Sequence, residues 1–266
     1  MSHPPRNNCF PNFIALKRRY PLAKYREKLA QKHEVVNFDD RRHKNKRTFK
    51  KIRKTEVHIV PRNLSQEDYV TELANLDNKI VFATGPAGTG KTMLATLMAI
   101  KALLGGSIEK ITLTRPAITA DEDLGFLPGD LNEKLMPWLK PIFDIFEEYY
   151  SPEEISEMIA EGIIEIAPIG YLRGRTFKNT IIIVDEGQNI SIGQCKMLLT
   201  RIGQGSRMFL CGDVAQTDIK YNNGFADILA KLEGKSIKGI CVCHFTILDV
   251  EREPIVKEIL NLYGDD

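Results

Sequence analysis

Short apolar segments alternate with helical patterns from about Leu64 to the end of the chain. Strands that are buried on both faces read as continuous apolar runs, and the helices between them allow consecutive strands to run parallel. We therefore expect an α/β fold in which a mostly parallel sheet is flanked by helices. Six segments are predicted to be strands: Ile80–Thr84, Lys110–Thr114, Ile163–Ala167, Thr180–Val184, Arg207–Cys211 and Gly239–Phe245.

Two longer segments have a helical pattern. Thr92–Leu104 is amphipathic, and Leu131–Tyr150 is helical but contains Pro137 and Pro141, which must kink or divide it. Two further helix starts fit the capping box, in which a serine and a glutamate or glutamine satisfy each other's backbone N–H groups. These starts are Ser151-Pro152-Glu153-Glu154 and Ser191-Ile192-Gly193-Gln194.

Residues 1–62 do not show this alternation of strand and helix patterns. They lack a sustained apolar period and are rich in lysine and arginine. Residues 1–54 carry 17 basic and 4 acidic side chains, whereas the rest of the chain carries 20 and 31. The sequence thus predicts a basic N-terminal extension over residues 1–62 and one catalytic domain over residues 63–266. The extension is interpreted as an arm for nucleic-acid phosphates, as a solvated tail that only aids solubility, or as a nuclear address.

Composition narrows the class of protein further. No apolar run reaches the roughly 18 residues needed to span a bilayer, and the N-terminus lacks the apolar stretch of a signal peptide. We expect a cytoplasmic protein without a membrane partner. The five cysteines are an odd number without zinc-site spacing, so we expect them to be reduced.

A glycine-rich string follows the first predicted strand and precedes a predicted helix. Gly85-Pro86-Ala87-Gly88-Thr89-Gly90-Lys91-Thr92 matches G-x-x-x-x-G-K-[ST] in full. The backbone N–H groups of such a loop and the positive end of the helix bind phosphate oxygens. Lys91 is predicted to reach the β- and γ-phosphates of ATP, and the Thr92 hydroxyl is predicted to ligate Mg²⁺.

Two acids follow the β-branched run Thr180–Val184, at the carboxyl edge where parallel sheets bind ligands. Asp185 is predicted to hold Mg²⁺ through water, and Glu186 is predicted to orient and deprotonate the attacking water. A kinase must instead keep water from the γ-phosphate, so this pair favours hydrolysis. Gln216 lies in a third polar strand end, Gly212–Gln216, and is predicted to contact the γ-phosphate or the water.

Together these motifs look like the first motor domain of superfamily 1 helicases, and more closely like the PhoH-like family of phosphate-starvation-inducible ATPases. The resemblance extends from Leu64 to the C-terminus. The strings that carry it, besides the glycine-rich loop, are Thr114-Arg115-Pro116-Ala117, residues 124–131 (Leu-Gly-Phe-Leu-Pro-Gly-Asp-Leu), residues 170–177 (Gly-Tyr-Leu-Arg-Gly-Arg-Thr-Phe), Asp185-Glu186-Gly187-Gln188-Asn189, Gly212-Asp213-Val214-Ala215-Gln216 and Asp249-Val250-Glu251-Arg252.

The resemblance implies a RecA-like P-loop NTPase fold, ATP and Mg²⁺ as cofactors, and an action on RNA. It also implies that Gln66 lies near the adenine. Gly187 departs from the alanine that is usual in the family, but it leaves both acids in place. Residues 1–62 do not resemble the usual N-terminus of the family and no nuclease domain is expected, so ribonuclease activity is not carried over.

A single motor domain leaves the γ-phosphate open on one side, whereas helicases of this superfamily place ATP between two such domains. A homo-oligomeric ring, such as a hexamer, would let a neighbouring subunit supply an arginine to the γ-phosphate. Arg175, Arg201 and Arg252 are candidates, and Arg252, after the last predicted strand, is the first choice. Each of them is otherwise a surface or ion-paired arginine.

A further group of residues is typical of contacts with nucleic acid. Arg115 follows the predicted strand Lys110–Thr114, and Arg173 and Arg175 form a small cationic cluster beside Tyr171 and Phe177. Arginine and aromatic side chains bind the backbone and the unpaired bases of single strands. The arginines equally suit ion pairs that tie loops to carboxylates, and the aromatic residues equally suit the core.

The predicted function is therefore an RNA-binding, RNA-stimulated ATPase or helicase that acts as a homo-oligomer on RNA or another single-stranded nucleic acid. Two alternatives remain. One is a nucleotide-dependent switch that acts on a protein partner, and the other is a P-loop kinase.

Overall fold

A computed structural model of the chain describes residues 56–116, 131–219, 221–251 and 255. All of them belong to one compact unit, Lys51–Asp266. The predicted boundary between residues 62 and 63 stays a prediction. Within the described residues, every helix is too short or too polar to cross a bilayer.

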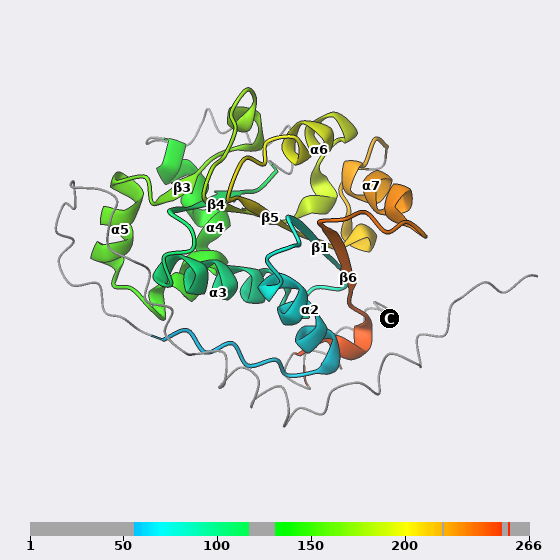
Figure 1. Cartoon of the computed structure of the whole chain (residues 1–266), viewed down its shortest axis with the longest axis horizontal. Coiled ribbons are helices and arrows are strands. Elements are labelled where there is room, and N and C mark those ends of the chain that lie inside the picture. The colour runs from blue at the N-terminus through cyan, green and yellow to red at the C-terminus, as the bar shows by residue number, and fades with distance from the viewer. Residues whose placement is uncertain (1–55, 117–130, 220, 252–254, 256–266) are drawn as a thin grey trace, which may run out of the picture. The chain divides into compact units, whose positions relative to one another are not determined.

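A six-stranded sheet organises this unit (Figure 1). The strand order is β3-β2-β4-β5-β1-β6, and every ladder between the described strands is parallel. The predicted parallel sheet is therefore confirmed. The strands are β1 (Ile80–Thr84), β2 (Lys110–Thr114), β3 (Ile164–Ile166), β4 (Thr180–Val184), β5 (Arg207–Gly212) and β6 (Ile240–His244).

Three strands differ from the prediction by one residue at one or both ends. β3 spans Ile164–Ile166 instead of Ile163–Ala167, and β5 extends to Gly212. β6 is also shorter than the predicted Gly239–Phe245. Gly239 has a φ of +87°, a left-handed conformation that cannot continue a strand, so the first of these residues is excluded from β6.

The helices and 3₁₀ turns alternate with the strands along the chain. Those before β3 are α2 (Leu64–Ala74), α3 (Lys91–Leu104), α4 (Leu131–Glu147) and α5 (Pro152–Ala160). Those after β3 are η1 (Ile169–Leu172), η2 (Gly187–Asn189), α6 (Ile192–Leu199), η3 (Val214–Gln216), α7 (Gly224–Leu232) and η4 (Ile247–Asp249). Both predicted capping boxes, at Ser151 and Ser191, are confirmed.

Helix α4 runs without interruption from Leu131 to Glu147, with Pro137 and Pro141 inside it. The prolines therefore do not divide the helix, the alternative that they kink it stays a prediction, and the helix ends three residues before Tyr150. Each proline removes one backbone hydrogen bond. Burial of Phe143 and Phe146 in the apolar layer on one face of the sheet, at 1% and 0% exposure, helps offset that loss.

Two apolar layers cover the two faces of the sheet, because alternate residues of a strand point to opposite sides. One layer joins Val81 and Ile183 to α2, α3, α4 and α5, and the other joins Phe82 and Ile182 to η1, α6 and α7. Figure 1 shows α2 and α3 on one side of the strands and α6 and α7 on the other. The architecture is a RecA-like α/β fold, with the loop between β1 and α3 at the carboxyl edge.

Candidate functional site

The glycine-rich loop lies between β1 and α3, as predicted. Gly85 has a φ of +141°, and a Cβ there would lie 2.3 Å from the carbonyl oxygen of Phe245. Gly90 is the N-cap of α3 with a φ of +83°, so the helix starts at Lys91, one residue before the predicted start. The loop therefore requires glycine at both positions, for space at the first and for conformation at both.

Lys91 turns back into the loop. Its Nζ donates hydrogen bonds to the carbonyl oxygens of Gly85 and Pro86, at 2.6 and 2.7 Å, and to Thr89 Oγ1 at 3.2 Å. Burial lowers the pKa of the Lys91 ammonium, although Cys211 and nearby carboxylates act in the opposite direction. The ammonium thus has three oxygen partners inside the loop that is predicted to bind phosphates.

Thr92 and Asp185 meet directly. The Thr92 hydroxyl donates to Asp185 Oδ1 at 2.7 Å, and the backbone N–H of Asp185 donates to the carbonyl of Thr114 at 3.0 Å. Burial raises the pKa of the Asp185 carboxyl, and the Thr92 hydroxyl and the Arg115 guanidinium lower it only in part. The hydroxyl and the half-buried carboxylate lie side by side, and hard oxygen ligands of this kind suit Mg²⁺.

Glu186 follows in a left-handed conformation, with φ +52° and ψ +42°. This conformation is rare for a residue with a Cβ and costs about 1–3 kcal/mol, so it persists only where the surroundings enforce it. The Glu186 carboxylate accepts a 2.6 Å hydrogen bond from Gln188 Nε2 and lies 3.4 Å from Arg115 Nη2. The strained backbone and these two partners together fix where the carboxylate points.

Gln188 is a site residue that sequence reasoning missed. It is 2% exposed, and its Oε1 accepts the backbone N–H of Asp213 at 3.0 Å while its Nε2 binds Glu186. Its Nε2 also lies 3.4 Å from the backbone carbonyl of Gln216. Gln188 therefore joins the strand end of β4 to the strand end of β5. Its place in the Asp-Glu-Gly-Gln-Asn string was the available signal.

The structure brings the backbone of Gln216 to the site, but the Gln216 side chain is exposed on η3. Its predicted contact with the γ-phosphate or the water stays a prediction. Gln66 lies at the other end of the site, on α2, and is 1% exposed. Its Nε2 donates to the carbonyl of Thr89 at 3.0 Å, so this side chain contacts the glycine-rich loop.

Arg115 pairs with both acids. Its guanidinium lies 3.6 Å from Asp185 Oδ2 and 3.4 Å from Glu186 Oε1, and its Nη1 donates to the carbonyl of Trp138 at 2.9 Å. The sequence left two interpretations open for this residue, a contact with nucleic acid or an ion pair with carboxylates. The ion pair is present.

Two candidate arginine fingers are engaged within the chain. Arg175 makes a bidentate ion pair with Glu165, and Arg201 donates to the carbonyls of Met197 and Arg175. Burial raises the pKa of Glu165, but the hydrogen bonds and charges of Arg175 and Lys110 outweigh it and hold the pKa below its ordinary value. The first choice, Arg252, lies outside the described residues.

The aromatic pair of the predicted nucleic-acid group divides between surface and core. Phe177 is 4% exposed and lies under the guanidinium of Arg175, 4.7 Å from it, so the core interpretation holds for this residue. Tyr171 is 65% exposed on η1, and Arg173 is exposed beside it. Tyr171 and Arg173 are therefore the members of the group that are open to a ligand.

Comparison with known proteins identifies the family of this chain. Residues 58–264 match the model of a family described as PhoH-like protein. The chain is 41% identical to the PhoH-like protein of Synechocystis sp. over 82% of its length and 66% of the relative's length. For the PhoH-like protein of Bacillus subtilis the identity is also 41%, over 90% of this chain and 73% of the relative.

Among solved structures, the helicase domain of Hef from Pyrococcus furiosus is similar with a TM-score of 0.39 and 14% identity, over 71% of this chain and 39% of that one. The matched part of this chain spans about two thirds of the Synechocystis relative. The family model covers nearly the whole sequence after the basic extension. The chain belongs to the PhoH-like protein family.

Proposed function

We propose that this chain binds ATP with Mg²⁺ and hydrolyses it. We also propose that single-stranded nucleic acid, with RNA as the preferred ligand, stimulates the reaction. One observation carries the ATPase part: the hydroxyl of Thr92 and the carboxylate of Asp185 lie 2.7 Å apart, with Glu186 next in the chain. The glycine-rich loop, the hydroxyl, the acid and a second acid thus lie at one edge of the sheet, where α/β folds bind ligands.

Each side chain of the site has a defined task in this proposal. Thr92 and Asp185 hold Mg²⁺, which when bound neutralises charge on the phosphate oxygens. Lys91 exchanges its carbonyl partners for the β- and γ-phosphates. Glu186 orients the attacking water and accepts its proton, and Gln216 contributes to positioning that water.

The nucleic-acid part of the proposal rests on charge and exposure. Residues 1–54 carry 17 basic against 4 acidic side chains, a density that suits a phosphate backbone. The exposed Tyr171 and Arg173 offer a stacking surface and a cation on η1, after β3. These features favour a ligand with both phosphates and unpaired bases.

We also propose that the protein is cytoplasmic and that its subunits assemble into a homo-oligomeric ring. Arg175 and Arg201 already have partners within their own chain, which leaves Arg252 as the candidate for supply to a neighbouring subunit. An arginine provided in this way contributes about 10³ to 10⁵ in rate in related phosphoryl-transfer systems. Arg252→Ala should then lower turnover while mixed rings with wild-type subunits recover part of it.

Phosphate release by purified full-length protein, with Mg²⁺ and with RNA, DNA or neither, tests the proposal. Lys91→Ala should reduce turnover by about 10²-fold or more, because the phosphates lose the ammonium group that the glycine-rich loop presents to them. Glu186→Gln should retain binding of a fluorescent ATP analogue but lose hydrolysis. Lys196→Ala and Glu157→Gln, the same changes at exposed positions on α6 and α5, serve as controls.

Normal turnover by Lys91→Ala or Glu186→Gln would show that the site is wrongly assigned. Transfer of the γ-phosphate to an added substrate, with little free phosphate in its absence, would favour the kinase alternative. Turnover that is unaffected by saturating RNA and DNA at low salt would remove the nucleic-acid part and favour the protein-partner switch.

A further inference from the structure

Arg115 stands directly beside both acids of the site. It follows β2 directly, and Thr114 at the end of β2 pairs with Val184 at the end of β4, so Arg115 stands beside Asp185.

Glu186 is held at both of its carboxylate oxygens. Oε1 lies 3.4 Å from the Arg115 guanidinium, and Oε2 accepts a 2.6 Å hydrogen bond from Gln188 Nε2. In this arrangement both carboxylate oxygens already have protein partners, which compete with an attacking water for Glu186.

The hold of Arg115 on the acids is loose. Charge-assisted N–H···O hydrogen bonds measure about 2.7–2.9 Å, whereas the two ion-pair distances are 3.4 and 3.6 Å. Arg115 Nε is buried and lacks a hydrogen-bond partner among the described residues. A phosphate would give the guanidinium short, bidentate hydrogen bonds that the carboxylates do not give it here.

The one short contact of Arg115 leads to α4. Its Nη1 donates to the carbonyl of Trp138 at 2.9 Å, and Trp138 lies between Pro137 and Pro141 in the helix. Arg115 thus has a second, uncharged anchor from which it can leave the acids without becoming unpaired.

We propose that Arg115 is a positioning residue that restrains Glu186 until the Arg115 guanidinium binds a nucleic-acid phosphate instead. Without nucleic acid, Arg115 keeps the Glu186 carboxylate paired, and ATP turnover is slow. When a backbone phosphate binds Arg115, Glu186 is released to orient water. The inference rests on the proposed function and specifies how the nucleic acid regulates that same site.

Replacement of Arg115 by glutamine in the full-length protein tests the restraint. Arg115→Gln should raise kcat for ATP without nucleic acid by about five-fold, the lower end of coupling between sites, and leave the KM for ATP nearly unchanged. Addition of poly(U) RNA or poly(dT) DNA should then stimulate turnover much less than in the wild type. Lys196→Gln, an exposed change on α6, should keep both the wild-type basal rate and the wild-type stimulation.

A second variant guards against loss of folding. Arg115→Lys keeps one positive charge but lacks the planar fork that spans two carboxylates, so its basal rate should lie between those of the wild type and Arg115→Gln. Thermal unfolding and binding of a fluorescent ATP analogue establish that each variant is folded. A basal rate at or below wild type in folded Arg115→Gln and Arg115→Lys would overturn the proposal.

The two levels of proposal fail in different ways. Turnover that survives Lys91→Ala disproves the ATPase assignment whatever Arg115 does. A wild type that ignores poly(U) and poly(dT) disproves release by nucleic acid. Turnover that depends on Lys91 and responds to poly(U), with an unchanged basal rate and unchanged stimulation in Arg115→Gln, disproves the role of Arg115 alone.

Discussion

Gln66 is held at both ends of its side-chain amide. Its Oε1 accepts the backbone N–H of Arg62 at 2.9 Å, and its Nε2 donates to the carbonyl of Thr89 at 3.0 Å. A Cβ on Gly90 would lie 3.0 Å from the same Nε2. Only 1% of the surface of Gln66 is exposed. Gln66 therefore supports the glycine-rich loop, in addition to being a candidate contact for adenine.

We predict that Gln66→Ala raises the KM for ATP and for GTP by similar factors. The variant leaves the Thr89 carbonyl without its buried donor, which costs about 1–3 kcal/mol and loosens the loop for any nucleotide. Steady-state kinetics with both nucleotides measures the effect. A rise in KM for ATP alone would show instead that Gln66 reads the base, as the family resemblance implies.

At the scale of elements, Arg207 joins strand β5 to the end of helix α2. It is 7% exposed, and its guanidinium donates to the carbonyls of Leu73 at 2.6 Å, Asn78 at 2.8 Å and Asn75 at 2.9 Å. Burial lowers the pKa of Arg207 to about 10. The last carbonyls of a helix have no helical donors, so this arginine satisfies groups that would otherwise be buried and unpaired.

Arg207→Ala is therefore predicted to destabilise the domain by about 3 kcal/mol, because several buried carbonyls lose their donors together. Arg207→Lys should recover part of this loss, since an ammonium still donates to some of the same oxygens. Urea unfolding followed by circular dichroism measures both variants. Arg173→Ala, which removes an exposed arginine on the loop after η1, should shift the midpoint little.

An unchanged unfolding midpoint in Arg207→Ala would mean that water reaches the end of α2 and replaces the guanidinium. The same helix carries Gln66, so a destabilised α2 should also weaken ATP binding. These two readouts together connect the element to the site.

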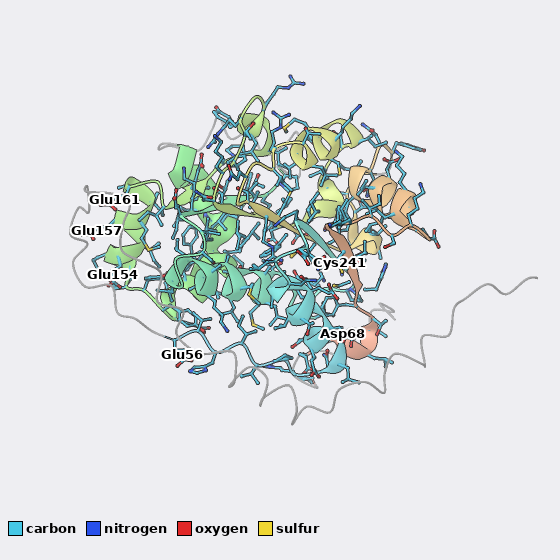
Figure 2. All side chains as sticks on the ribbon, in the orientation of Figure 1. Glu56, Asp68, Glu154, Glu157, Glu161 and Cys241 are labelled. Atoms are coloured by element: carbon cyan, nitrogen blue, oxygen red, sulfur yellow. The ribbon has the colours of Figure 1, made fainter. Side chains whose placement is uncertain are left out.

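Opposite charges are separated along the whole molecule. Residues 1–54 have a net charge of +13, whereas the remainder has a net charge of −11. Part of the acidic excess lies on α5, where Figure 2 labels Glu154, Glu157 and Glu161 along the edge of the domain. A nucleic acid is attracted by the basic extension and repelled by such an acidic helix, so charge favours an approach that avoids α5.

We predict that the basic extension sets the salt dependence of nucleic-acid binding. Replacement by glutamine within residues 41–47, at Arg41, Arg42, Lys44, Lys46 and Arg47, should lower the slope of log K against log salt by roughly one for each phosphate that these side chains neutralise. Fluorescence anisotropy with labelled poly(U) measures this slope. The same change at exposed Lys196, Lys235 and Lys238 is the control. An unchanged slope would favour the solvated-tail interpretation.

Much of the fold was predictable because buried parallel strands have a recognisable pattern. All six strands lie where the apolar runs predicted them, with ends displaced by at most one residue. The continuity of α4 was not predictable, since Pro137 and Pro141 argue locally for a break. Burial of the helix in the apolar layer that includes α3 and α5 outweighs that local preference, and burial is a property of the assembled core.

The candidate site divides in the same way. The glycine-rich loop and the acids Asp185 and Glu186 are recognisable in the chain because their spacing is set by consecutive residues around one turn and one strand end. The role of Gln188 and the ion pairs of Arg115 were not recognisable in the chain, because they depend on partners that follow other strands. Gln188 bonds to Asp213, 25 residues later, and Arg115 pairs with acids that follow the neighbouring strand β4.

The amino-acid sequence alone was therefore enough for the family, the parallel sheet, and the glycine-rich loop and acids of the candidate site, since each depends on local pattern. The tertiary structure decided which of several similar side chains have partners. It buried Phe177, engaged Arg175 with Glu165, and placed Arg115 on Glu186. Those outcomes depend on the strand order β3-β2-β4, which brings distant segments to one edge and which a linear pattern does not specify.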